Sequence, residues 1–150
     1  MMKTKVCFIG CGGIGNYHFS HLVEFEDVEF LAFCDLKIER AQNFKERSGQ
    51  GNVYTDYKLM LESEKPDCVY ICVEPCAHGE IEEIVVGRYG LHVFVEKPMA
   101  LSMELAEKTA AMIKEKGVVS SIGFQDRYLD IIEVTKEMIK DRAIGLISGG

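Results

Sequence analysis

The residues best suited to chemistry are the glycines of VCFIGCGGIGNYH, the segment at residues 6–18. They form GxGxxG between an apolar run and an amphipathic run, which is typical of the turn between the first strand and first helix of a dinucleotide-binding unit. The first glycine would permit the tight turn, the second would let backbone approach a diphosphate, and the last would let the helix pack closely. Helix-end amides there would face an anion. The expected contacts are Gly10, Cys11, Gly12, Gly13, Ile14 and Gly15.

An acid follows at the spacing that this pattern requires. Asp35 ends the second apolar run, 20 residues beyond Gly15, where a carboxylate can accept hydrogen bonds from both hydroxyls of an adenosine ribose. Asp35 could also be the N-cap of the helix that follows, and both roles can hold at once. Leu36 and Lys37 are expected beside the same adenosine. The carboxylate favours NAD by repelling the extra phosphate of NADP, whereas Lys37 could pair with that phosphate and keeps NADP open.

A second charged group follows the fifth apolar run. Glu96, Lys97 and Pro98 stand directly after LHVFVE, at the edge of a parallel sheet where ligands bind. Proline fixes its own φ and restricts the residue before it to extended geometry. We therefore expect Lys97 to be a positioned ammonium group; the alternative is a surface lysine paired with Glu96.

These residues need strands and helices to position them. Strand-length apolar runs occur at 5–10, 28–35, 67–73, 91–96 and 118–124, with a possible edge strand at 52–55. Amphipathic segments of helical period occur at 14–25, 36–49, 57–63, 78–90 and 102–117. Ser102 can cap a helix start, and Gly49, Gly90 and Gly117 stand where helices would stop. Strands alternating with helices predict an α/β fold with a doubly wound parallel sheet.

The tail differs from this pattern. It is helical in period through about Asp141 and then reads as a strand, AIGLISGG at 143–150, with no evident partner. We expect residues 1–124 to form the dinucleotide-binding domain, and 125–150 to form a connecting helix and the start of a second domain. An unpaired strand favours association through its edge, so we also expect a homo-oligomer.

Composition excludes several classes of protein. The chain has 150 residues and a formal net charge of −7, with 47% hydrophobic and 27% charged residues. A negative field disfavours nucleic acid as a partner. No apolar run reaches the roughly 20 residues of a membrane helix, and the N-terminus lacks the pattern of a signal peptide. We expect a cytoplasmic globular protein without membrane or nucleic-acid partners.

Six cysteines raise the question of a metal or of disulfides. Cys7, Cys34, Cys68 and Cys72 lie inside apolar runs, where a reduced cysteine serves as a small buried hydrophobe. No CxxC pair occurs, and the spacing of Cys68, Cys72 and Cys76 matches neither a zinc ribbon nor a ferredoxin. No metal site is expected.

The ordered set of segments resembles the glucose-fructose oxidoreductase, inositol dehydrogenase and rhizopine-catabolism family, written Gfo/Idh/MocA. The resemblance rests on GCGGIG, CDLKIERA, VYTDYKLML, ICVEPCAHGEI, VFVEKPMALSMELAEK and GFQDRY. It implies a six-stranded Rossmann domain with strand order 3-2-1-4-5-6 that binds NAD or NADP. It also implies a second α/β domain that holds most of the substrate, a sugar or cyclitol whose secondary alcohol is oxidised.

The resemblance also implies roles for individual residues. Lys97 would be catalytic and reach the nicotinamide ribose and the substrate hydroxyl, while Glu96 would contact the cofactor or orient the lysine. Arg127 matches a frequent arginine after the sixth strand. The segment after the fourth strand would line the nicotinamide half of the crevice through Val73, Glu74, Pro75 and His78.

Departures from the family pattern limit these expectations. Glu74-Pro75-Cys76 replaces the usual Thr-Pro-Pro or Thr-Pro-Asn turn. The aspartate and histidine of the second domain, which commonly carry the proton, have no counterpart, and none of the four histidines matches that position. We therefore expect cofactor binding with poor turnover. Two alternatives stay open: a non-enzymatic NAD-responsive regulatory module, and a methyltransferase that binds adenosylmethionine at the glycine loop.

Overall fold

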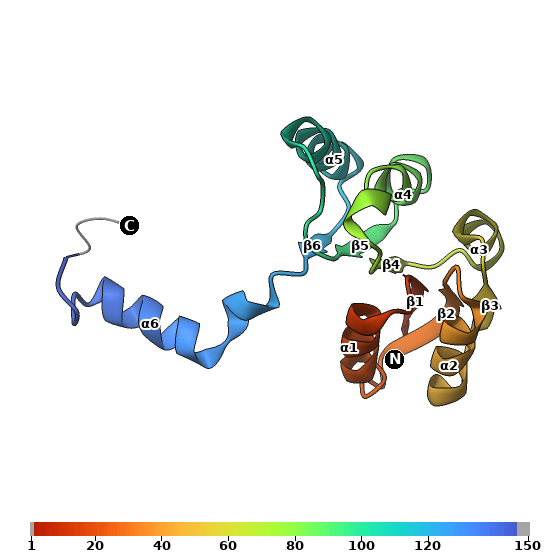
Figure 1. Ribbon diagram of the computed structural model, residues 1–150, viewed down its shortest axis with the longest axis horizontal. Coiled ribbons are helices and arrows are strands. Elements are labelled where there is room, and N and C mark those ends of the chain that lie inside the picture. Colours follow the sequence, from red (N-terminus) through yellow and green to blue (C-terminus); the bar gives the residue numbers. More distant parts are fainter. Residues whose placement is uncertain (1, 147–150) are drawn as a thin grey trace.

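The computed structural model describes residues 2–146, whose six strands form one sheet with the order β3-β2-β1-β4-β5-β6 (Figure 1). All neighbouring strands are parallel. The strands are β1 (Thr4–Ile9), β2 (Val28–Cys34), β3 (Asn52–Tyr54), β4 (Cys68–Ile71), β5 (His92–Val95) and β6 (Ser120–Ile122). The predicted doubly wound α/β class and the strand order are confirmed.

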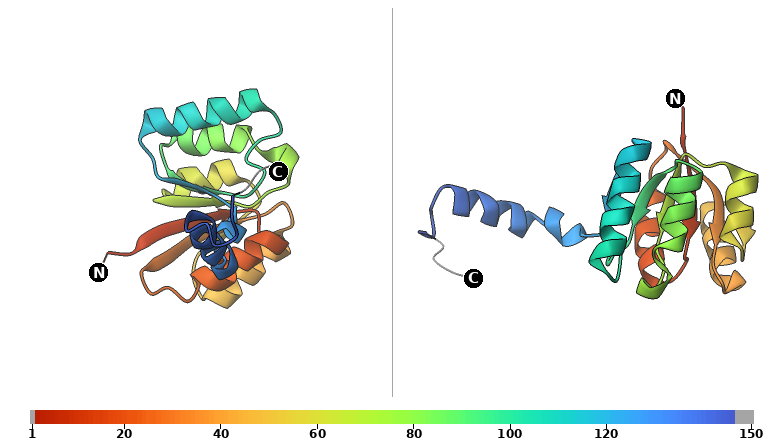
Figure 2. Two further views of the ribbon diagram at one scale, coloured as in Figure 1. Left: turned by 90° about the vertical axis from the view of Figure 1, so that its left-hand side faces the viewer. Right: turned by 90° about the horizontal axis from the view of Figure 1, so that it is seen from above.

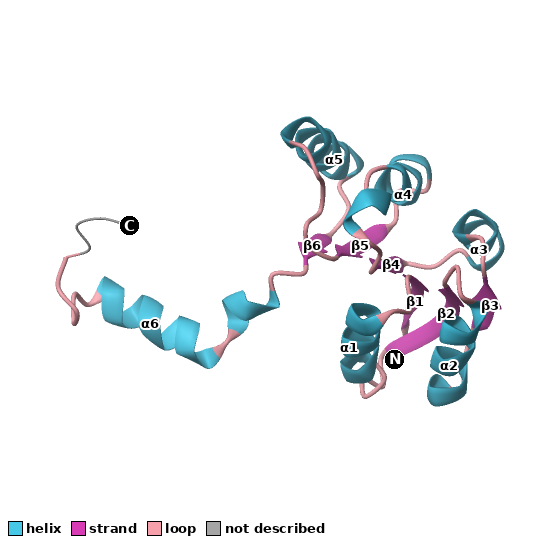
Figure 3. Cartoon of the chain, viewed as in Figure 1, coloured by secondary structure: helices cyan, strands magenta, loops and turns pink. Residues whose placement is uncertain are grey.

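Helices cover both faces of the sheet (Figure 2). One face carries α1 (Gly13–Leu22) and α2 (Ile38–Ser48), and the other carries α3 (Tyr57–Glu64), α4 (Glu80–Glu82) with the π-helix η2 (Glu83–Arg88), and α5 (Met103–Lys116). Figure 3 shows this layering, with the helices above and below the strands. The reversal of winding between β1 and β4 creates the switch point at which ligands bind in such sheets.

The helix ends follow the capping residues in the sequence. The Ser102 hydroxyl accepts from the Leu105 N–H at 3.2 Å at the start of α5. Gly49, Gly90 and Gly117 have φ values of 66°, 64° and 63°, the left-handed region that stops a helix. Asp35 is not the N-cap of α2, because Lys37 occupies that position. The carboxylate of Asp35 still accepts from the Lys37 N–H at 2.8 Å, so it supports the helix start from two residues earlier.

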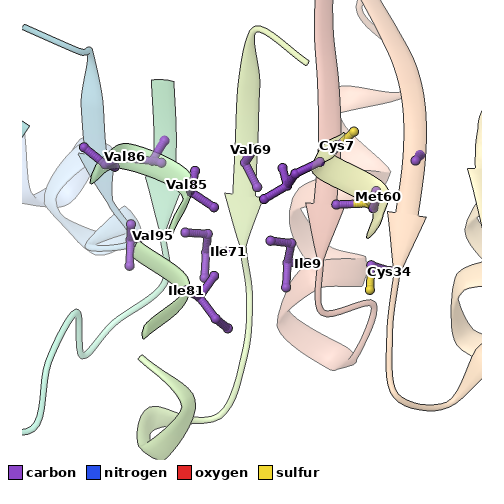
Figure 4. Packing of buried hydrophobic residues seen from close by; sticks show 13 residues of the cluster. Cys7, Ile9, Cys34, Met60, Val69, Ile71, Ile81, Val85, Val86 and Val95 are labelled. Carbon is purple, nitrogen blue, oxygen red and sulfur yellow. The ribbon is translucent and has the colours of Figure 1, made fainter. Parts of the chain in front are cut away.

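The two faces of the sheet have different cores. The α1 and α2 face is aromatic, and its fully buried rings pack with centroid distances of 4.4–6.3 Å: Phe8, Phe19, Phe30, Phe33 and Phe44. The opposite face is aliphatic, with Ile9, Ile71 and Val95 from the strands packed against helical side chains (Figure 4). Alternation along the strands sends neighbouring residues to opposite faces.

The strand register places the ends of the strands level with one another. Ile9 lies opposite both Cys34 and Ile71, and Ile71 lies opposite Val95. Val95 in turn lies opposite Ile122. The residues that follow these strands therefore emerge along one carboxyl edge. That edge brings together the glycine loop, Asp35 and Glu96, far apart in the sequence.

Two segments differ from the sequence-based expectation. The single helix expected at 78–90 is divided into α4 and the π-helix η2, in which the Tyr89 N–H donates to the Ile84 carbonyl, and a short 3₁₀ turn η1 (Pro75–Ala77) precedes it. Apolar spacing over so short a segment could not distinguish an α-helix from a single turn of π-helix. The strand expected at 143–150 is wrong for residues 143–146, which form a turn and coil; its remaining residues, 147–150, lie outside the described residues.

Helix α6 (Asp130–Lys140) follows the 3₁₀ turn η3 (Gln125–Tyr128) and extends away from the sheet (Figure 1). It has no buried residue. Its apolar side chains are exposed, including Ile131, Val134 and Met138. The core of the described chain therefore belongs to the Rossmann unit alone. No helix among residues 2–146 combines the length and apolar character needed to cross a membrane.

Candidate cofactor-binding site

The glycines of the loop divide into two kinds by geometry. Gly10 has φ +94°, and a Cβ there would overlap the carbonyl group of Cys72. A Cβ on Gly15 would overlap the carbonyl oxygen of Gly10. At Gly13 a Cβ would meet nothing within 4 Å, and at Gly12 only the Arg40 guanidinium at 3.6 Å. The fold itself thus needs Gly10 and Gly15, whereas Gly12 and Gly13 leave space above the helix.

Helix α1 begins beneath that space. Gly12 is its N-cap, with extended backbone and no side chain to accept from the first amides. The first intrahelical bond runs from the Asn16 N–H to the Gly12 carbonyl at 2.8 Å. Because the first amides of a helix lack intrahelical acceptors, they point at whatever lies over the helix end. The loop can therefore hold an anionic group such as a diphosphate.

Asp35 closes one side of this site. The Asp35 residue is 9% exposed, and its two carboxylate oxygens accept from the Cys11 N–H and the Lys37 N–H, each at 2.8 Å. These bonds fix the carboxylate between the glycine loop and α2 and use one lone pair on each oxygen. The remaining lone pairs are available to a ribose.

Arg40 is a site residue that sequence reasoning missed. Its guanidinium lies 3.9 Å from Asp35 Oδ2, and about half of the side chain is exposed. It stands at the start of α2, one helical turn beyond Leu36, which is 93% exposed. A basic residue five positions after the fingerprint acid was the available signal, because the first turn of α2 faces the same edge.

Glu96 marks the other end of the edge and is only 2% exposed. Its Oε1 lies 2.6 Å from His18 Nε2 on α1, and its Oε2 accepts from the Lys97 N–H at 2.9 Å. A Cβ on Gly123, after β6, would overlap the carboxylate. Glu96 is therefore enclosed by α1, β6 and its own turn.

Lys97 is exposed beside this buried acid. The peptide bond between Lys97 and Pro98 is cis. Arg127 is also exposed, on η3. The neighbouring residues Glu96 and Lys97 thus differ in burial: the acid side chain is buried, and the lysine is exposed at the carboxyl edge.

The segment after β4 is exposed in its first part and becomes buried at His78. Glu74 and Pro75 are exposed and Val73 is half-buried. The His78 side chain is fully buried, with Nδ1 2.6 Å from Glu82 Oε1. Glu82 is also fully buried and accepts from the Gly79 N–H at 2.5 Å through Oε2. His78 thus holds this segment from inside, an arrangement that helical periodicity gave no reason to expect.

Two thiols lie beneath the glycine loop. Burial, together with the nearby Glu96 carboxylate, raises the pKa of the Cys72 thiol to about 12. Burial and Asp35 raise the pKa of Cys11 well above its usual range. Both thiols stay neutral near pH 7 and line the loop as apolar groups. All six cysteines are free.

Other parts of the described surface are weaker candidates for a ligand site than this edge. A hollow of about 660 Å³ lies near the amino ends of β2 and β3, between Lys3, Gln50 and Glu64, on the side of the sheet opposite to where ligands bind in this class of fold. Within residues 2–146, no group of three or more histidine, cysteine or acidic side chains is placed to hold a metal ion.

Comparison with known proteins agrees with this geometry. The model of an oxidoreductase family with an NAD-binding Rossmann fold, Gfo/Idh/MocA, matches residues 4–124. The chain belongs to this family. Residues 4–124 are thus a Gfo/Idh/MocA NAD-binding domain.

Relatives of the family match most of the chain. Myo-inositol 2-dehydrogenase of Thermotoga maritima is 28% identical over 141 residues, which are 94% of this chain and 42% of the relative. The crystal structure of myo-inositol 2-dehydrogenase from Lactobacillus plantarum superimposes with a TM-score of 0.89 at 30% identity, covering 97% of this chain and 43% of that one.

A ligand-bound member gives the same result. The structure of scyllo-inositol dehydrogenase from Lactobacillus casei with bound NAD(H) and scyllo-inositol superimposes with a TM-score of 0.86 at 25% identity. The match covers 95% of this chain and 42% of that one. The chain spans less than half the length of these Gfo/Idh/MocA relatives. The resemblance seen in the sequence motifs is confirmed at the level of family and fold.

Proposed function

We propose that this chain binds NAD along the carboxyl edge and is the cofactor-binding part of a dehydrogenase that acts on a secondary alcohol of a sugar or cyclitol. The observation that carries the proposal is the division within the glycine loop. Gly10 and Gly15 are required by packing, whereas Gly12 and Gly13 leave open space over unpaired helix amides. The substrate class follows from the names of the relatives, which include inositol dehydrogenases.

In this proposal each candidate has a place along the dinucleotide. The adenosine end is held by Asp35, with Leu36 and Lys37 beside it, and the diphosphate lies over Gly12, Gly13 and Ile14 with Cys11 beneath. The nicotinamide end lies near Lys97 and near the segment after β4, which contributes Val73, Glu74, Pro75 and the backbone of His78.

When bound, the nicotinamide would supply the hydride acceptor for alcohol oxidation. Lys97 would hold the nicotinamide ribose and the substrate hydroxyl by donating hydrogen bonds from its ammonium group. Glu96 would orient that lysine from beneath, since its carboxylate bonds the Lys97 N–H and is almost fully buried. A base for the hydroxyl proton is expected outside these residues, and we therefore expect little turnover by this chain alone.

NAD is the proposed preference, and NADP is a weaker ligand. Asp35 would repel a 2′-phosphate, while Lys37 and Arg40 on the adjoining turn would attract one. The net charge of −7 supports a protein without nucleic-acid partners. A cytoplasmic location and a homo-oligomer remain predictions, the second of which light scattering would test.

Calorimetric titration with NAD, NADP and adenosylmethionine tests the cofactor assignment. Gly12→Ala is the informative variant, because its backbone suits an L-residue and its Cβ meets only Arg40, so the fold should be kept. We expect this variant to melt like the unaltered chain and to lose NAD affinity by about tenfold or more, because the added methyl keeps the diphosphate from the amides. Adenosylmethionine binding in place of NAD would overturn the proposal.

Turnover distinguishes an enzyme part from a regulatory module. Sugars and inositols with NAD should give little or no NADH from this chain, and brisk turnover would contradict the expectation of an incomplete catalytic set. A regulatory module would bind NAD equally well, but its function would not change when Lys97 is substituted. Replacing with alanine the lysine that matches Lys97 in a full-length relative of this family should lower turnover sharply and change NAD affinity modestly.

A further inference from the structure

We propose that His18 is a positioning residue for Lys97, acting through Glu96, and that it couples the diphosphate-binding helix to the nicotinamide end of the site. This inference rests on the proposed function, in which Lys97 meets the nicotinamide half of NAD. Sequence reasoning treated His18 as a polar or packing residue of the first helix. The structure places it in a chain of contacts between two halves of the crevice.

The contact between His18 and Glu96 is short and enclosed. Nε2 lies 2.6 Å from Oε1, with side-chain exposures of 11% and 3%. A carboxylate only accepts hydrogen bonds, so Nε2 carries a proton and donates it. The bond joins α1 to the end of β5, 78 residues later in the sequence. A hydrogen bond to a buried charged group is among the stronger ones in a protein.

The His18 ring is also held in place by aromatic packing. Its centroid lies 4.5 Å from that of Phe94 on β5, and 6.2 Å from that of Tyr70 on β4. Tyr70 and Phe94 stack on each other at 4.8 Å. The ring therefore has little freedom, and Nε2 is presented to Glu96 from a fixed position.

Glu96 transmits this position to the lysine. Its second oxygen accepts from the Lys97 N–H at 2.9 Å, and Gly123 leaves room for the carboxylate because a Cβ there would overlap it. The carboxylate is thus clamped between His18 and the backbone of Lys97. Moving or removing the imidazole donor frees Glu96 to rotate and loosens the turn that carries Lys97.

His18 also stands one helical turn after Gly15, in the helix whose amino end would face the diphosphate in the proposed binding mode. The same helix therefore sets both the diphosphate site and, through His18 and Glu96, the lysine. Since α1 is short and packed on the sheet, the two functions share one rigid element. We infer that this coupling fixes the distance between the two ends of the dinucleotide site.

Two variants separate the donor from the ring. His18→Phe keeps an aromatic ring against Phe94 and removes the donor, whereas His18→Gln can still donate an N–H to Glu96. Each variant is titrated by calorimetry with NAD and with ADP, which reaches the adenosine and diphosphate sites but has no nicotinamide half. A cooperative melting transition in each variant would show that it is folded.

We expect His18→Phe to lower NAD affinity about fivefold, because losing one charge-assisted hydrogen bond to Glu96 displaces Lys97 only in part. ADP affinity should stay within about twofold. His18→Gln should retain most of the NAD affinity. In a Lys97→Ala background, His18→Phe should cause no further change in the ratio of NAD to ADP affinity. Hydrogen exchange at the Lys97 amide should quicken in the Phe variant and not in the Gln variant.

Equal losses for NAD and ADP, or equal behaviour of the Phe and Gln variants, would overturn the positioning role and leave His18 a packing residue. The failure of the proposed function is different and is seen in the unaltered chain, as an absence of binding by both NAD and ADP. If the Phe variant does not fold, the Gln variant and the exchange rate at Lys97 still decide between the two roles.

Discussion

The two ends of the carboxyl edge each carry an acid, and they use it differently. Asp35 and Glu96 each accept a backbone N–H from the turn beside them and each lie near a basic side chain. Asp35 keeps 9% of its surface exposed and meets Arg40 only at 3.9 Å, whereas Glu96 is 2% exposed and bonds His18 at 2.6 Å. Asp35, at the proposed adenosine end, thus keeps part of its surface available to a ligand, whereas Glu96, at the proposed nicotinamide end, is occupied by contacts within the protein.

A second buried acid strengthens the contrast. Glu82 is fully enclosed with His78 under the segment after β4. In the described chain, His78 Nε2 is buried without a hydrogen-bond partner. The nicotinamide end therefore concentrates buried carboxylate–imidazole pairs. We expect substitutions there to act first on stability, and substitutions at the adenosine end to act first on ligand affinity.

The largest expected effect concerns the buried thiols of the sheet and appears at alkaline pH. Burial raises the pKa of Cys7, Cys34 and Cys72 to about 12 from an ordinary value of 9.0. The thiols stay neutral in the folded chain while they ionise in the unfolded chain. Stability is therefore complete below about pH 9 and is lost as pH rises toward 12, by about 1 kcal/mol for each thiol at pH 10.

Urea unfolding between pH 7 and 10.5 measures this loss. Cys72→Ala should remove the contribution of one thiol to the pH dependence of the free energy of unfolding. Cys76→Ala, at an exposed position, should leave that dependence unchanged. A flat stability profile to pH 10.5 would mean that these thiols are hydrated and that the floor of the glycine loop is not closed.

The next effect tests the closed end. Glu82→Leu should lower the free energy of unfolding by about 3 kcal/mol, because His78 and the Gly79 N–H would be left buried without the carboxylate. The neighbouring Glu83→Leu loses only an exposed ion pair with Lys108 and should change stability by less than about 1 kcal/mol. Equal effects for both variants, measured by urea unfolding, would mean that the Glu82 carboxylate is not enclosed with His78.

Sequence alone predicted the exposed end better than the closed one. The glycine spacing and Asp35 predict an adenosine site by residue type and distance along the chain, and the strand register brings these residues to one edge. The partners of Glu96 could not be predicted in this way. His18 lies 78 residues away and is selected by how α1 crosses the sheet. Glu82 has a polar residue type inside the helix expected at 78–90, and the residue spacing did not indicate that its carboxylate is buried against His78 and the Gly79 N–H.

An intermediate effect tests the ligand-facing role of Asp35. Asp35→Ala should weaken NAD binding by about thirtyfold, since two charge-assisted hydrogen bonds to the ribose would be lost. Asp67→Ala is the matched control, because Asp67 also accepts a backbone N–H, from Lys5 at 2.9 Å, but lies at the opposite edge of the sheet. NAD titration of both variants separates loss of a ligand contact from loss of a backbone hydrogen bond. Similar affinities in the two would show that Asp35 serves the loop only.

The smallest effect concerns Arg40 and sharpens the description of the open end. Its guanidinium stands beside Asp35 and over Gly12, where the 2′-phosphate of NADP would lie in the proposed binding mode. Arg40→Ala should weaken NADP about fivefold and NAD less than twofold, because a half-exposed ion pair contributes only about 1 kcal/mol. Arg47→Ala removes a cation from the same helix, but this one rests on the Phe19 ring at 4.8 Å. It should lower the melting temperature without changing the ratio of NAD to NADP affinity. An unchanged ratio in both variants would mean that the charge beside Asp35 does not reach the ligand, and that Lys37 or the acid alone sets the preference.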